Sequence, residues 1–86
     1  MKIVYTSKFE REYRKLPEQV KILAEEKEKI FRNNPLSPRL KRHKLHGKFK
    51  EFWSFSVDYK YRIVFEISKD KKTFYFHSVS DHDIYK

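Results

Sequence analysis

The positions of apolar residues divide the chain into a short first strand, two helices and a group of later strands. Residues 2–6, KIVYT, are rich in β-branched and aromatic side chains, which favours a strand. Ser7 follows, and the stretch SKFE is typical of a capping box, in which the side chains of Ser7 and Glu10 each accept from the other's backbone amide. We therefore predict that Ser7 caps a helix.

Two apolar stripes at helical spacing follow this cap. The stripe of the first helix consists of Phe9, Tyr13 and Leu16. Pro17 ends that helix and suits the first turn of the next one, which residues 17–34 continue with apolar residues near one face. Residues 33–38, NNPLSP, close the second helix, because the residue before a proline is disfavoured in the α conformation. The pattern predicts a helical hairpin.

After Gly47 the spacing of apolar residues changes from that of a helix to a period of two residues. The segments that this pattern favours as half-buried strands are residues 53–58, 61–67 and 73–80. The polar stretch SKDKK joins the last two by a short turn, and consecutive strands with short loops form an antiparallel meander. We predict one α+β domain over residues 1–86, in the order β-α-α-β-β-β, with the sheet packed on the helical hairpin.

Composition narrows the class of protein. Eight Phe, six Tyr and one Trp supply the core of this small chain, and only one Gly and three Pro are present, which argues against a disordered linker. Cysteine is absent, so disulfides and thiolate metal sites are excluded. The start of the chain, MKIVY, is too polar for a signal peptide, and no apolar run approaches the roughly 20 residues that cross a bilayer. We expect a cytoplasmic protein without a membrane partner.

Positive charge is concentrated in the middle of the chain. The formal net charge is +9, and residues 39–62 account for +6 of it. Lysine and arginine interleaved with aromatic residues favour a polyanionic partner, because contacts with phosphates release condensed counterions. A basic surface that only maintains solubility is the alternative, and charge by itself does not separate the two.

Two histidines lie in the basic stretch RLKRHKLHGKFKEFWSF, residues 39–55. His43 and His46 have no carboxylate or thiolate at ligand spacing around them, which argues against a zinc site. Considered one at a time, each histidine is expected to be solvated.

Arg62 differs, because it lies inside the predicted strand YKYRIVFEI. Alternation sends its side chain to the face opposite the core positions, beside Ser54 or Ser56 of the neighbouring strand. A guanidinium fixed in this way suits a phosphate, which it can bind through two parallel hydrogen bonds. A cross-strand salt bridge to Asp58 or Glu66 is the structural alternative.

The order of the elements, the block LHGKFKEFWSFSVDYKYRIVFEI and the tail SVSDHDIYK together resemble the RelE/ParE superfamily of type II toxin–antitoxin toxins. The resemblance spans nearly the whole chain and is greatest to its RelE-, YoeB- and YafQ-like branch. It implies a RelE-like fold and a metal-independent endoribonuclease, or mRNA interferase, that needs no cofactor and cuts mRNA in the ribosomal A site. The partners that it implies are a cognate antitoxin, the ribosome and mRNA.

The resemblance also implies roles for single residues. His82 occupies the matching place just beyond the last strand and would protonate the departing 5′-oxygen, with Asp81 or Asp83 orienting the ring. Arg62 matches the arginine of the family's Y-R-I-V strand and would hold the scissile phosphate. The expected RNA contacts are Lys44, Lys48, Lys50, His43, Lys60 and Tyr85. Tyr85 would stack on a base or, alternatively, only attach the terminus to the domain.

The general base is less clearly indicated. YoeB-like members supply a carboxylate upstream of the glycine, whereas the corresponding stretch here, PRLKRHKLHG, contains neither Asp nor Glu. His46 is the expected substitute, with His43 or a lysine as alternatives.

Two other functions fit the same sequence. A ParE-like toxin shares the fold but inhibits DNA gyrase by binding protein, and a basic nucleic-acid-binding domain would cut nothing. His82 favours the ribonuclease, because the gyrase-directed branch has no need of a proton-transfer residue at that position.

Overall fold

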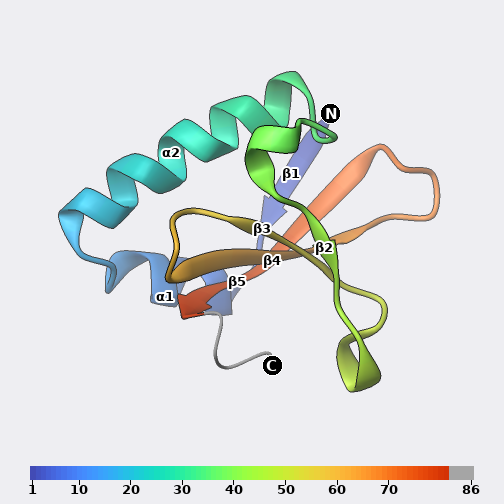
Figure 1. Cartoon of the computed structure of the whole chain (residues 1–86). Coiled ribbons are helices and arrows are strands. Elements are labelled where there is room, and N and C mark those ends of the chain that lie inside the picture. Colours follow the sequence, from blue (N-terminus) through green and yellow to red (C-terminus); the bar gives the residue numbers. More distant parts are fainter. Residues whose placement is uncertain (82–86) are drawn as a thin grey trace.

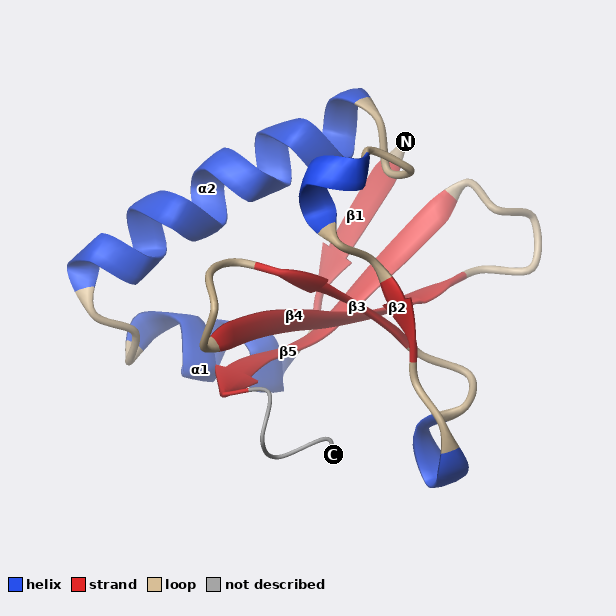
Figure 2. Ribbon diagram, viewed as in Figure 1, coloured by secondary structure: helices blue, strands red, loops and turns tan. Residues whose placement is uncertain are grey.

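The computed structural model describes residues 1–81 of the chain. The strands are β1 (Lys2–Tyr5), β2 (His43–Lys44), β3 (Trp53–Ser56), β4 (Tyr61–Ile67) and β5 (Thr73–Asp81), and the helices are α1 (Ser7–Arg14) and α2 (Glu18–Asn33). Two 3₁₀ turns, η1 (Pro38–Leu40) and η2 (Gly47–Phe49), flank β2. Both long helices belong to one layer and the strands to another, as Figures 1 and 2 show.

The strands form one mixed sheet in the order β1-β5-β4-β3-β2. Antiparallel pairs join β2 to β3, β3 to β4 and β4 to β5, whereas β1 runs parallel to β5. The predicted α+β class and the antiparallel meander are confirmed. The two-residue strand β2 was not predicted, because so short a segment carries no measurable alternation.

Thr6, and not Ser7, caps the first helix, so the predicted capping box is wrong. The Thr6 hydroxyl accepts from the amide of Phe9 at 3.1 Å and donates to the carbonyl of His77 at 3.0 Å. The amide of Thr6 also donates to the carbonyl of Phe76, which extends the pairing of β1 with β5 up to the helix. A cap residue has extended dihedral angles, and Thr6, which directly follows β1, meets that requirement.

The core lies between α2 and one face of the sheet. Phe31 of α2 is fully buried, and its ring centroid lies 5.0–5.4 Å from those of Phe55, Phe65, Phe74 and Phe76. Aromatic pairs at this separation add to the energy of apolar burial. This cluster holds the sheet against α2 and leaves the opposite face of β3 and β4 for other contacts (Figure 1).

That opposite face is more covered than alternation predicts. Ser54 and Ser56 are only 2% and 7% exposed, so β3 is buried on both faces and the predicted half-buried pattern is wrong there. The reason is the segment of β2 and η2, whose residues lie beside this face and line a cleft with Ser54.

A β-bulge changes the facing of residues near the end of β5. Val64 pairs with Ser78, but the next residue of β4, Phe65, pairs with Phe76, so His77 is the extra residue.

Within residues 1–81 no helix is both long enough and apolar enough to span a membrane.

Candidate functional site

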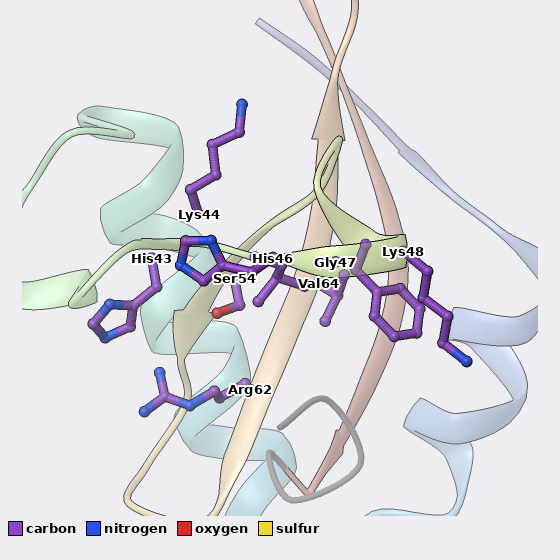
Figure 3. A pocket seen from close by; sticks show the side chains of 10 residues that line it. His43, Lys44, His46, Gly47, Lys48, Ser54, Arg62 and Val64 are labelled. Carbon is purple, nitrogen blue, oxygen red and sulfur yellow. The ribbon is translucent and has the colours of Figure 1, made fainter.

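The main cleft of the described chain has a volume of about 660 Å³ and lies on the sheet face opposite α2 (Figure 3). Residues 43–49, which contain β2 and η2, form its wall, while β3 and β4 form its floor. Its lining residues are His43, Lys44, Leu45, His46, Gly47, Lys48, Phe49, Ser54, Arg62 and Val64. The cleft thus combines residues of the basic middle segment with the arginine of β4.

Arg62 projects from the floor of this cleft. It pairs with Ser56 in the β3–β4 register, and its Nη1 donates to the Ser56 hydroxyl at 3.0 Å. The predicted position beside Ser56, on the face opposite the core, is confirmed. Asp58 instead accepts from the amides of residues 60 and 61, and the Glu66 carboxylate contacts His77. Among the described residues, Ser56 accepts a hydrogen bond from one of the five N–H groups of the guanidinium, and this bond orients the guanidinium plane from β3.

His43 lies on the same side of the sheet as Arg62. It is the register partner of Ser54, and Figure 3 shows its imidazole on the side of the strands where the guanidinium of Arg62 lies. His46 lines the same cleft immediately before η2. Imidazoles accept or donate protons near neutral pH, so the cleft brings groups suited to proton transfer to a fixed cation.

No cluster of three or more His, Cys, Asp or Glu side chains suited to a metal ion occurs in residues 1–81. The polar side chains of the cleft are two imidazoles, three cations and the hydroxyl of Ser54, a set suited to anionic oxygens.

The two lysines that border the cleft face in different directions. Lys44 pairs with Trp53, and its Nζ lies 5.2 Å from the Trp53 ring, where the Arg42 guanidinium also lies at 4.5 Å. Figure 3 shows the Lys44 side chain pointing away from Arg62. Lys48, by contrast, lies on η2 with its Nζ 5.2 Å from the Phe49 ring that lines the cleft. The geometry therefore favours Lys48 over Lys44 as a contact for a ligand in the cleft.

Two further predicted RNA contacts, Lys50 and Lys60, lie outside the cleft lining. Lys50 is exposed directly after η2, and Lys60 is exposed in the β3–β4 turn with its Nζ 5.4 Å from the Tyr61 ring. His82 and Tyr85 lie outside the described residues. Arg62 is the register partner of Ser80 on β5, two positions before His82 in the sequence.

The structure also brings together polar residues that sequence reasoning did not single out. The Nε2 atom of His77 lies 3.1 Å from a carboxylate oxygen of Glu66 across the β4–β5 pair. Alternation puts both residues on the face opposite the core, but their contact depends on the β4–β5 register, in which Glu66 pairs with Tyr75 and His77 lies diagonally opposite. A carboxylate and an imidazole eleven positions apart were therefore not recognisable as a pair from the sequence.

Comparison with known proteins gives structural matches alone. Neither a scan against protein-family models nor a search of curated proteins finds a match. The YoeB/ParE toxin from Agrobacterium tumefaciens superposes with a TM-score of 0.79 at 18% identity, covering 95% of this chain and 99% of that one. A chain of the E. coli DinJ–YafQ toxin–antitoxin complex superposes with a TM-score of 0.75 at 17% identity, covering 95% of this chain and 92% of that one.

The similarity extends to archaea. A chain of the RelE–RelB complex from Pyrococcus horikoshii OT3 gives a TM-score of 0.74 at 13% identity, with 93% of this chain and 92% of that one covered. Each superposition includes nearly all of both chains, so the strands that carry Arg62 and the cleft belong to the shared architecture. The chain therefore has the fold of the RelE/ParE superfamily of toxins.

Proposed function

We propose that this protein is the toxin of a type II toxin–antitoxin system and that it cleaves mRNA on the ribosome as a metal-independent endoribonuclease. The observation that carries this proposal is Arg62, a guanidinium held by Ser56 at 3.0 Å on the floor of an open cleft that also contains His43 and His46. On a fold shared with toxins, this arrangement of cation and imidazoles suits a phosphodiester.

In the proposed reaction the ribose 2′-oxygen attacks the adjacent phosphorus. A new P–O2′ bond forms and the P–O5′ bond breaks, which leaves a 2′,3′-cyclic phosphate and a 5′-hydroxyl. A base removes the 2′-proton and an acid protonates the departing 5′-oxygen. Arg62 supports this step because a guanidinium keeps its charge at all working pH values and can pair two phosphate oxygens as negative charge builds up.

The proton-transfer roles follow from the position of each histidine. His46 lines the cleft and is proposed as the base, with His43 beside it as the alternative. His82 is proposed as the acid, since it directly follows Asp81, the last residue of β5, in the sequence. This assignment is supported by the pairing of Arg62 with Ser80 of β5, the strand that ends at Asp81 immediately before His82 in the sequence.

An acidic antitoxin is the proposed protein partner. Two of the similar structures come from toxin–antitoxin complexes, DinJ–YafQ and RelE–RelB. Residues 39–62 carry a net charge of +6, which favours a segment of opposite charge. The ribosome, mRNA and antitoxin together place the proposed activity in the cytoplasm.

The test is single-turnover cleavage of A-site mRNA on purified, programmed ribosomes. Loss of a proton-transfer group typically slows a reaction by roughly 10²- to 10⁴-fold. His46→Gln and His82→Gln should therefore each lower the cleavage rate by a factor in this range, without loss of ribosome binding. Arg62→Lys keeps the charge but not the planar fork, and should slow cleavage and weaken mRNA binding together. Lys29→Ala, an exposed change on α2, is the matched control and should cut normally.

Two outcomes would redirect the assignment. Cleavage by Arg62→Ala at the wild-type rate would remove Arg62 from the site. Growth arrest in cells whose transcripts stay intact while gyrase is inhibited would identify a ParE-like toxin instead.

A further inference from the structure

The end of β5 lies against α1 and not against a second neighbouring strand. β1 pairs with β5 only over residues 73–76, whereas β5 continues to Asp81 with β4 on one side. On the other side, in the part of the chain that the structure describes, residues 77–79 contact α1 and its cap residue (Figure 2). The strand therefore exchanges a strand neighbour for a helix neighbour before it reaches its pairing with Arg62.

Two side chains replace the hydrogen bonds of a strand at this edge. The Thr6 hydroxyl donates to the carbonyl of His77 at 3.0 Å. One carboxylate oxygen of Glu12 accepts from the amide of Val79 at 3.1 Å and from the hydroxyl of Ser78 at 2.7 Å. The backbone groups of alternate residues point to the same edge of a strand, so these side chains bind the groups that a neighbouring strand would otherwise bind.

The held segment lies between a bulge and the phosphate site. The bulge at His77 interrupts the β4–β5 ladder, so pairing with β4 is locally disrupted where Glu12 binds the strand. Beyond the bulge, Ser80 pairs with Arg62, and the strand ends immediately before His82 in the sequence. The Glu12 contact is therefore placed to set the position of the end of β5 relative to Arg62.

Water does not readily replace the Glu12 carboxylate. Ser78 and Val79 are each 1% exposed, so removal of the carboxylate takes the acceptor from two buried donors. Such donors regain partners when the strand moves towards solvent, because a buried unpaired donor is costly. A displacement of about 1 Å in a catalytic site can slow a reaction by roughly 10²-fold.

We propose that Glu12 is a positioning residue for RNA cleavage. By holding the end of β5, it places His82, the proposed acid, at the departing 5′-oxygen of a phosphodiester bound by Arg62. Glu12 acts through the strand and not on a reacting atom. The proposal rests on the proposed function, because it takes His82 as the acid of the cleavage reaction.

The test compares two mRNA substrates on programmed ribosomes that differ in one atom. In natural mRNA the P–O5′ bond breaks and the departing oxygen needs a proton, whereas sulfur in place of that oxygen leaves as a thiolate that needs none. Glu12→Ala should cut natural mRNA more slowly, by up to roughly 10²-fold, and should cut the sulfur substrate at close to the wild-type rate. His82→Gln should show the same dependence on the substrate, whereas Arg62→Ala should be slow on both substrates.

Three variants control for a purely structural effect. Glu12→Gln keeps an oxygen that can accept from β5 and should cut natural mRNA normally. Ala24→Gly lowers stability from within α2 and should cut both substrates normally under conditions where it is folded. The double variant of Glu12→Ala with His82→Gln should be no slower on natural mRNA than His82→Gln alone, because both changes affect one step. An equal deficit of Glu12→Ala on both substrates, or wild-type cleavage of natural mRNA by Glu12→Ala, would overturn the positioning role.

A measurement without ribosomes separates this proposal from the proposed function. The imidazole C–H resonances of His82, identified by their loss in His82→Gln, should shift in Glu12→Ala and stay in place in Glu12→Gln and Ala24→Gly. Unshifted resonances in Glu12→Ala would also overturn the positioning role. Shifted resonances in a protein that cuts no mRNA would retain the positioning of His82 and reject the ribonuclease, whereas cleavage without the dependence on the leaving atom would do the reverse.

Discussion

The carboxylate of Glu12 on α1 accepts a hydrogen bond from the hydroxyl of Ser78 on β5, at 2.7 Å. The same oxygen accepts from the backbone amide of Val79 at 3.1 Å. β1 pairs with β5 only over residues 73–76, so the edge of β5 beyond that point has no neighbouring strand. Glu12 takes the place of a strand partner there and fixes the part of β5 that leads to residue 82.

Removal of this carboxylate should destabilise the domain. In Glu12→Ala the buried Ser78 hydroxyl and the Val79 amide lose their acceptor, a change that typically costs about 1–3 kcal/mol. Chemical denaturation followed by circular dichroism measures the free energy of unfolding. Glu26→Ala, an exposed glutamate of α2, is the matched control and should stay within about 0.5 kcal/mol of wild type. Equal stability of Glu12→Ala and Glu26→Ala would show that water replaces the carboxylate at no cost.

The different directions of Lys48 and Lys44 predict different effects on RNA binding. Each phosphate contact with single-stranded RNA contributes about −0.7 to the slope of log affinity against log salt concentration. Lys48→Ala should therefore make the slope less steep by about 0.7, because the Lys48 ammonium lies 5.2 Å from the ring of Phe49, which lines the cleft. Lys44→Ala should leave the slope unchanged, because the Lys44 ammonium lies over Trp53. Binding titrations of one uncleavable RNA oligomer at several salt concentrations measure the slope for each variant. A larger change of slope in Lys44→Ala than in Lys48→Ala would contradict the geometry.

Gly47 should be needed for the shape of the cleft wall. Its φ angle is +67°, in the left-handed region, and a Cβ added there would have no atom within 4 Å. The cost of Gly47→Ala is therefore conformational and not steric, about 1–2 kcal/mol. Gly47→Asn should cost less, since asparagine tolerates this region. Thermal unfolding measures the stability of the two variants. An equal loss of stability in both would mean that the backbone angle at residue 47 is not the cause.

Stability at alkaline pH should depend on Tyr5. Burial, followed by the hydrogen bond that its hydroxyl donates to Glu28, raises the pKa of Tyr5 above the ordinary value of 10.0. The stabilisation that this shift represents is fully present below pH 10.0, where the phenol is protonated in both states, and is lost as pH rises through the raised pKa.

The comparison that isolates this effect is wild type against Tyr5→Phe. The pKa of Tyr13 is also raised, but Tyr13 is present in both proteins and its effect cancels. The wild-type advantage in the free energy of unfolding should be constant at neutral pH and should shrink above pH 10.0. Denaturant midpoints across this range measure it, and an advantage that persists undiminished would exclude the Tyr5 phenol as its source.

The sequence by itself determined the class of fold and the facing of Arg62. Both depend on local periodicity, because a period of two assigns each residue of β4 to one face wherever the strand lies. The same reasoning left Ser54 or Ser56 as the neighbour of Arg62, and the register of the β3–β4 pair decided for Ser56. The helix cap at Thr6 was missed because its hydroxyl also binds His77, a contact that spans 71 positions.

Tertiary structure alone decided the parallel pairing of β1 with β5, the acceptor role of Glu12 and the contact of Glu66 with His77. Glu12 and Ser78 are 66 positions apart, and no local pattern connects them. The bulge at His77 reverses the facing of the residues after it, so alternation counted along β5 fails from that point. The direction of Lys44 was likewise settled by β2, a strand of two residues that forms only because β3 is there to pair with it.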